Sequence, residues 1–161
     1  MIFTSSYDKC NTKDYKTYSI SKDKGVDANY NGDYFLDLAP KESFFRIWKN
    51  NRGIVPFDEN TKYYVNEFYN QILKNLDPKE VYQKLDNSIL LCYENNLDFC
   101  HRHLVAAWFE LLLGVEVFEV VVNGLEYEIV DKPSYIKDYL KEVMDKDDVN
   151  YFEKGKVNSK S

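Results

Sequence analysis

The chain has 161 residues, of which 44% are hydrophobic and 16% aromatic, and its net charge is −6. This length predicts one domain with a hydrophobic core, and the composition excludes a disordered chain. The negative charge argues against a protein that binds nucleic acid or membrane surfaces through a basic face, and no apolar run is long enough for a membrane span. Three cysteines without a signal-peptide pattern predict reduced thiols and a cytoplasmic location.

The first third of the chain is expected to hold two short strands, a long loop and a helix. Residues 2–6 and 18–21 each combine apolar and hydroxyl side chains, a pattern that favours a short strand. Residues 22–40 show no clear periodicity, and a loop of that length in a compact domain often acts as a lid or binding loop. Residues 41–50 follow a proline and are rich in apolar side chains, which predicts a short helix.

The middle of the chain is expected to place two helices before a central strand. Large apolar residues recur every fourth position towards the end of 60–76, which predicts an amphipathic helix. Asp77 is a typical helix cap and Pro78 a typical first helical residue, so a second helix is expected to run through Leu85. Residues 88–93 are apolar on both faces, as in the central strand of a parallel sheet.

The last third predicts a buried helix, a hairpin and a final helix. Residues 99–113 are apolar almost all round, so this helix is expected to be buried. Two strands, at 115–122 and 125–130, are joined by Asn123-Gly124, a dipeptide with a strong hairpin preference. A final helix is expected over 133–144.

Together these elements predict a single α/β domain over residues 1–146, followed by a polar, flexible tail over 147–161. Strands alternate with helices, which indicates a mostly parallel central sheet flanked by helices. The hairpin would add an antiparallel pair near the C-terminus.

Polar side chains follow three of the predicted strands. In open α/β sheets, ligands bind outside the carboxyl ends of the strands, so these side chains are expected to gather around the start of the buried helix. The candidate site residues are Ser5, Ser6, Ser21, Lys22, Tyr93 and Glu94 at the strand ends, and Cys100, His101 and Arg102 at the helix start.

The same segments carry a resemblance to a known family. LLCYE at 90–94 and FCHRHLVAAWFE at 99–110, with weaker matches at SIS 19–21, LAP 38–40 and LDPKEVYQKL 76–85, resemble the bacterial and phage proteins grouped as domain-of-unknown-function family 488 (DUF488). The resemblance implies a small Rossmann-like fold with an uncharacterised activity. Many relatives carry arginine at the position of Lys22, so this chain keeps the positive charge there but loses bidentate recognition of an anion.

Arg102 is the strongest candidate for ligand binding. A cation in the first turn of a helix opposes the helix dipole at a cost of about 0.3–1 kcal/mol, which points to a compensating negative partner. Two partners stay open, a bound anion and the carboxylate of Glu94, and they are compatible if the ligand joins the pair.

Cys100 and His101 have both structural and catalytic interpretations. A thiol at a helix N-terminus beside a histidine can act as a nucleophile, but no phosphate cradle follows Cys100, so packing is the favoured role. His101 lies nearer the strand ends and can serve as a general acid or base, with a hydrogen-bonded structural role as the favoured alternative. His103 shares the helix's one polar stripe with Ala107 and Glu110, which predicts partial exposure.

A zinc site formed by the cysteines and histidines is disfavoured by spacing. Cys-x7-Cys-His-x-His fits no standard structural pattern, and adjacent residues on a helix point about 100° apart. Cys92 lies within the central strand and is expected to be core. We therefore expect no metal ion and no cofactor.

Aromatic residues offer a wall for a nucleobase or another flat ligand, although core packing is the favoured explanation. The residues concerned are Tyr30, Tyr34, Phe35, Trp48 and Tyr93.

The leading hypothesis is a cytoplasmic α/β domain that binds a small anionic ligand, a nucleotide or nucleotide derivative. It is either an enzyme, in which His101, Glu94 or Cys100 carries the chemistry, or a module that binds or sequesters a nucleotide signal. The third hypothesis is a protein-interaction domain in which the Cys-His-Arg cluster is structural.

Overall fold

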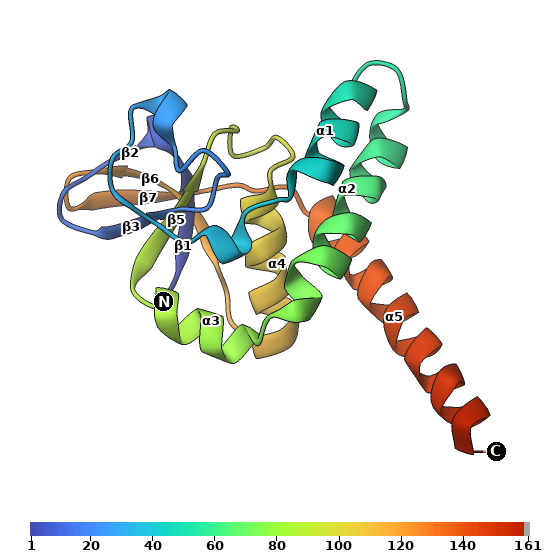
Figure 1. The fold of residues 1–161 in the computed structure, drawn as a ribbon. Coiled ribbons are helices and arrows are strands. Elements are labelled where there is room, and N and C mark those ends of the chain that lie inside the picture. Colours follow the sequence, from blue (N-terminus) through green and yellow to red (C-terminus); the bar gives the residue numbers. More distant parts are fainter. Residues whose placement is uncertain (160–161) are drawn as a thin grey trace.

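The structure, a computed structural model, describes the backbone of residues 1–159 and the side chains of residues 1–149. Seven strands of this part of the chain form one sheet, beside which the helices pack (Figure 1). The strands are β1 (Phe3–Ser6), β2 (Cys10–Asn11), β3 (Lys16–Ser19), β4 (Asp33–Tyr34), β5 (Ser88–Cys92), β6 (Phe118–Asn123) and β7 (Glu126–Val130). The α-helices are α1 (Glu42–Asn51), α2 (Phe57–Gln71), α3 (Pro78–Leu85), α4 (His101–Leu113) and α5 (Tyr135–Ser159).

The sheet is mostly parallel, which confirms the predicted α/β class. Its strand order is β2-β6-β1-β5-β3-β4, and β7 pairs antiparallel with β6. All five residues of β5 are buried between β1 and β3, with Leu90 opposite Thr4 and Tyr18. A strand paired on both sides and covered on both faces requires the continuous apolar run seen in the sequence.

Two core clusters lie on the two faces of β5. The larger cluster includes Leu90 and residues from all five α-helices. The smaller cluster includes Ile89 and Leu91, and it is covered by aromatic side chains such as Tyr7 and Tyr30. The alternation along β5 thus assigns one face to the helices and the other to aromatic residues from strands and loops.

Local sequence explains several of the element boundaries. The Asp77 side chain accepts hydrogen bonds from the backbone N–H groups of Lys79 and Glu80, which confirms it as the cap of α3. The hairpin is also confirmed, although its two loop residues are Gly124 and Leu125, because Asn123 still pairs with Glu126.

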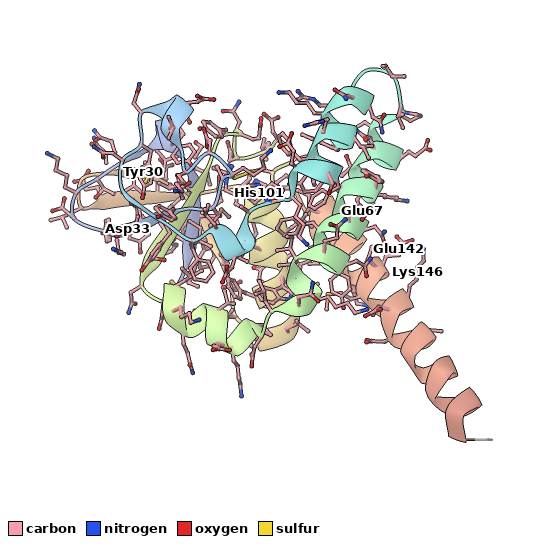
Figure 2. All side chains as sticks on the ribbon, in the orientation of Figure 1. Tyr30, Asp33, Glu67, His101, Glu142 and Lys146 are labelled. Atoms are coloured by element: carbon pink, nitrogen blue, oxygen red, sulfur yellow. A yellow bond between two sulfur atoms is a disulfide. The ribbon has the colours of Figure 1, made fainter. Side chains whose placement is uncertain are left out.

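The C-terminal helix is longer than predicted. It runs from Tyr135 to Ser159 and does not end near 144, so most of the expected tail over 147–161 is helical. Charged pairs four residues apart support it, Lys141 with Asp145 and Lys146 with Glu142, the second labelled in Figure 2. Residues 160 and 161 lie outside the described residues, and flexibility of the tail stays a prediction.

Among the described residues, no helix has the length and apolar character needed to cross a membrane.

Candidate functional site

A cavity of about 520 Å³ lies at the carboxyl ends of β3 and β5, beside the first turn of α4. Its wall comes from the loop after β3, the turn before α1, the helices α1 and α2, and the stretch from the end of β5 to the start of α4. The lining residues are Ser21, Lys22, Asp23, Asp27, Pro40, Phe45, Trp48, Lys49, Tyr64, Cys92, Tyr93, Glu94, Phe99, Cys100 and His101.

Most of the residues expected at the strand ends line this cavity. Those brought together are Ser21, Lys22, Tyr93, Glu94, Cys100 and His101, whereas Ser5, Ser6 and Arg102 are not among the lining residues. The residues predicted at the ends of β3 and β5 and at the start of α4 thus lie around one cavity, whereas the two predicted at the end of β1 do not.

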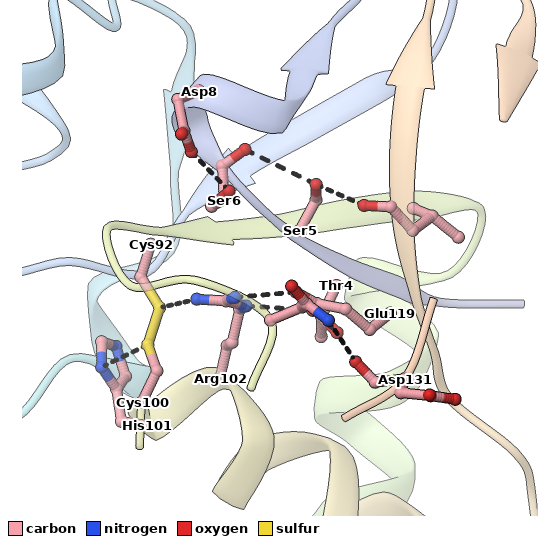
Figure 3. Close-up of polar contacts among 12 residues, drawn as sticks. Thr4, Ser5, Ser6, Asp8, Cys92, Cys100, His101, Arg102, Glu119 and Asp131 are labelled. Carbon is pink, nitrogen blue, oxygen red and sulfur yellow. Dashed lines mark hydrogen bonds and ion pairs between the residues drawn. A yellow bond between two sulfur atoms is a disulfide. The ribbon is translucent and has the colours of Figure 1, made fainter. Parts of the chain in front are cut away.

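Arg102 is engaged in a buried ion pair and does not line the cavity. Its Nε and Nη2 atoms donate to Glu119 at 3.0 and 2.7 Å, and both side chains are at most 2% exposed (Figure 3). Thr4 also donates to Glu119, at 2.7 Å. The internal partner expected from the sequence, Glu94, is wrong, because Glu94 ends up exposed at the cavity while the Arg102 side chain crosses to β6. A lone carboxylate within the apolar strand β6 was the signal that could have identified Glu119.

The two serines of β1 also have internal partners. Ser5 donates to the Val120 carbonyl and Ser6 to the Asp8 carboxylate, each at 2.6 Å (Figure 3). Both hydroxyl groups are buried, and these contacts join β1 to β6 and to the segment that follows β1.

His101 is held in one tautomer by the backbone. Its Nε2 lies 2.7 Å from the carbonyl oxygen of Ile20, and because a carbonyl only accepts, Nε2 must carry the proton. Nδ1 then keeps its lone pair, 4.0 Å from the Cys100 sulfur. Burial lowers the His101 pKa from 6.5 to about 4, so the ring is neutral near pH 7. Figure 2 shows this side chain in the interior, where the sheet meets α4.

The cysteines depart from the expectation of three reduced thiols. Cys92, at the end of β5, and Cys100, before α4, are joined by a disulfide in the structure (Figure 3). Cys10 is a free thiol, and burial raises its pKa to about 11. Cys92 is buried as predicted, yet it is one of the residues that line the cavity.

His103 is buried, so the prediction of partial exposure is wrong. Only 3% of the residue is exposed, and burial, followed by the nearby charge of Arg102, lowers its pKa to about 3. The helix face expected to be polar is itself covered: Ala107 is buried, and the Glu110 side chain is mostly buried in an ion pair with Lys132.

The loop after β3 is ordered around Asp23. The carboxylate accepts hydrogen bonds from the hydroxyl of Tyr93 and from the backbone N–H groups of Gly25 and Asp27. Desolvation raises the pKa of Asp23, but these hydrogen bonds together outweigh it and leave the pKa below its ordinary value. The loop therefore forms one edge of the cavity and is tied to the end of β5.

Positive charge gathers where this loop meets α1. The Lys22 ammonium pairs with Glu42 and lies 4.6 Å from the centre of the Phe45 ring. Desolvation, followed by the charges of Arg46 and Lys49, lowers the Lys22 pKa. Sequence reasoning missed Lys49, because its place beside Lys22 depends on how α1 packs.

Aromatic side chains form another part of the cavity wall. Trp48 packs edge-on against Tyr64, with ring centres 5.3 Å apart, and Phe99 contacts both rings. Of the five aromatic residues predicted as a wall, Trp48 and Tyr93 line the cavity. The other three lie elsewhere: Tyr30 beside Tyr7, Tyr34 beneath Lys24, and Phe35 against the larger core.

Comparison with known families gives one match. The model of DUF488-N3a, described as the active DUF488-N3 subclade, matches residues 9–112. The chain belongs to the DUF488-N3a family. No curated protein and no solved structure matches it. Every residue that lines the cavity lies within the part matched by DUF488-N3a, whereas Glu119, the partner of Arg102, lies after it.

Proposed function

We propose that this cavity binds a small ligand that combines a flat ring with an anionic group, a nucleotide or a nucleotide derivative. The observation that carries the proposal is a single cavity with lysines on one edge and aromatic rings along the adjoining wall. Its volume of about 520 Å³ falls within the usual range for sites that take small molecules.

Lys22 and Lys49 are the proposed anion-binding groups, in place of Arg102. Both line the cavity, and Arg46 lies near enough to lower the Lys22 pKa together with Lys49. Like charges held close together repel one another, and a bound phosphate or carboxylate would relieve that repulsion. Glu42, the present partner of Lys22, is more than half exposed, so this pair can open at little cost.

The aromatic wall is the proposed contact for the ring of the ligand. Trp48 and Phe45 are partly exposed and lie on the same helix as Lys49. Stacking on such side chains suits any nucleobase, because every base has a π face. A base against Trp48 would therefore place its phosphate within reach of the lysines.

Two activities fit this site, and they differ in what happens to the ligand. In an enzyme, Nδ1 of neutral His101 would accept a proton and the Glu94 carboxylate would hold or transfer one. In a binding module, the same cavity would sequester a nucleotide signal unchanged. A cytoplasmic location and a bacterial or phage source complete the proposal.

A thermal-shift screen of nucleotides, sugar phosphates and inorganic phosphate tests it. Wild type is compared with the Lys22→Ala/Lys49→Ala double variant and with Lys84→Ala, which removes an exposed lysine of α3 outside the cavity. We expect nucleotides to raise the melting temperature of wild type and Lys84→Ala. Loss of two charge contacts in the double variant should weaken binding by about tenfold or more.

Two results would count against nucleotide binding. One is no shift with any anion, which would favour a protein-interaction domain. The other is an equal shift in the double variant, which would place the ligand elsewhere. Chromatography of the best ligand after incubation with the protein then separates turnover from simple binding.

A further inference from the structure

Three potential metal ligands meet in the cavity wall. One ligand atom from each of Cys92, Cys100 and His101 lies within 4.8 Å of the other two, and all three residues are buried. Zinc holds sulfur and nitrogen ligands at about 2.0–2.3 Å in a tetrahedron, which separates its ligand atoms by about 3.5–3.8 Å. Nδ1 of His101 lies 4.0 Å from the Cys100 sulfur, close to that separation, whereas the two sulfurs are bonded to each other and must separate before they can share an ion.

The backbone conformation explains why these three residues converge although their spacing in the sequence disfavours a zinc site. Cys100 precedes α4 with an extended conformation (φ −152°, ψ 145°), so it does not follow the 100° rotation between neighbours on a helix. Cys92 ends β5, and the turn between the two elements returns the chain to the same edge of the sheet. Two elements thus supply three ligands to one point.

His101 is prepared to coordinate through Nδ1. Metal-bound histidines commonly donate their second ring N–H to a carbonyl or carboxylate, which orients the ring. Here Nε2 donates to the Ile20 carbonyl at 2.7 Å, and Nδ1 faces the Cys100 sulfur at 4.0 Å.

Arg102 supports negative charge on the first sulfur. Glu119 occupies Nε and Nη2 of the guanidinium, and the remaining Nη1 donates to Cys92 Sγ at 3.4 Å. A hydrogen bond from a cation favours a thiolate, the form of sulfur that binds metal. The buried Arg102–Glu119 pair therefore acts as an outer support for the cluster.

The distance between the two cysteine backbones also favours an ion between the sulfurs. The Cα atoms of Cys92 and Cys100 are 7.5 Å apart, wider than the roughly 4.4–6.8 Å usual for a disulfide. Two thiolates that share an ion need more separation than two bonded sulfurs, because the ion lies between them.

We propose that Cys92, Cys100 and His101, once reduced, bind one Zn²⁺ ion and leave its fourth coordination position open to the cavity. A dithiol reductant supplies two electrons and two protons to the Cys92–Cys100 bond and is itself oxidised to a disulfide. The two thiols formed each release a proton to solvent when Zn²⁺ binds. This site does not depend on which ligand the rest of the cavity takes, but a zinc ion on Nδ1 would exclude the proton-accepting role of His101.

Zinc titration of the reduced full-length protein tests the site without any ligand. Apo-protein is loaded with zinc sulfate, desalted and assayed for metal, and its thiols are mapped by alkylation with and without zinc. We expect about one zinc per chain, with Cys92 and Cys100 protected and Cys10 alkylated in both samples, because Cys10 is outside the cluster.

Matched variants keep the test decisive. Cys92→Ser, Cys100→Ser and His101→Gln should each weaken zinc binding at least about tenfold, and Cys10→Ser should bind as wild type does. Circular dichroism of each zinc-free variant shows whether it is folded. If a variant does not fold, the alkylation of wild type still decides.

The proposal is overturned if reduced wild type retains no zinc, or if zinc leaves the alkylation of Cys92 and Cys100 unchanged. Equal loss of zinc in Cys10→Ser would also overturn it. Any of these outcomes leaves the nucleotide proposal standing, because the thermal-shift screen is run without metal.

Discussion

The Arg102–Glu119 pair is the most consequential contact at the scale of single residues. Both side chains are fully or nearly fully buried, and two hydrogen bonds join them. Thr4 and Cys92 take up further hydrogen-bonding capacity of the two groups. Removing one member would leave the other as an uncompensated buried charge.

Arg102→Ala is therefore expected to lower the free energy of unfolding by about 3–5 kcal/mol. Urea denaturation measures this loss. Arg46→Ala, which removes an exposed arginine paired with Glu42, should change stability by less than about 1 kcal/mol and serves as the control. A loss below about 1 kcal/mol in Arg102→Ala would contradict the structural role of the pair.

His103 predicts a specific dependence of stability on pH. Its pKa is about 3 in the folded state and near 6.5 when unfolded, so between these values only the unfolded chain takes up the proton. The free energy of unfolding should fall as the pH drops through this window, and the stability is restored above it. By about pH 4, His103 should have lowered the free energy of unfolding by an amount on the order of 3 kcal/mol.

The comparison of wild type with His103→Gln isolates this effect from other titrating groups. Chemical denaturation at several pH values gives the difference between the two proteins. The difference in the free energy of unfolding should narrow as the pH falls from 6.5 towards 4. Only wild type loses stability in this range, because its unfolded chain protonates a histidine that stays neutral in the folded state. A constant difference would mean that His103 is protonated in the folded state.

Helix capping and turn geometry govern stability at the scale of elements. Asp77 caps α3 through two backbone N–H groups, so Asp77→Ala should lower the free energy of unfolding by about 1 kcal/mol. Asp77→Ser keeps a capping oxygen and should retain most of that stability. Thermal or chemical denaturation compares the variants, and equal losses would show that the cap contributes little.

The hairpin between β6 and β7 depends on the backbone of Gly124. This residue has a φ of +63°, and an added Cβ would meet nothing closer than 3.9 Å, so strain comes from the backbone alone. Gly124→Ala should cost about 1 kcal/mol, and Gly124→Asn less, because asparagine tolerates this conformation better. The reverse order in denaturation experiments would contradict the assigned turn.

Elements with a strong local signal were predictable from the sequence. The apolar run of β5, the cap of α3 and the hairpin appear as expected. The amphipathic helix predicted over 60–76 is also present, but α2 begins at Phe57 and ends at Gln71, before the last two residues of the apolar repeat. The strands β2 and β4 were not, because two residues carry no periodic pattern. The extension of α5 was missed because its polar sequence was taken for a tail, although its charged pairs support a helix.

At the scale of the whole molecule, the sheet topology determines where the cavity lies, and the direction of each side chain determines which residues line it. Parallel strands brought Lys22 and Glu94 to the start of α4, which the order of elements predicted. The choice of Glu119 as partner of Arg102 depends on how α4 is rotated against β6, and no local pattern encodes that rotation. The same is true of Lys49, which reaches the cavity through the packing of α1.

The most direct test of the cavity as ligand site uses the two histidines as probes. They are the chain's only two, and they lie two positions apart, yet His101 lines the cavity and His103 does not. A two-bond ¹H–¹⁵N NMR spectrum of the imidazole rings, recorded near pH 7 without metal, reports the tautomer and environment of each ring. Titration with the four ribonucleoside monophosphates follows in the same sample.

We expect a neutral His101 with its proton on Nε2, whose signals move on titration with at least one nucleotide while those of His103 stay in place. A proton on Nδ1 of His101, or nucleotide binding that leaves the His101 signals unchanged, would contradict this expectation.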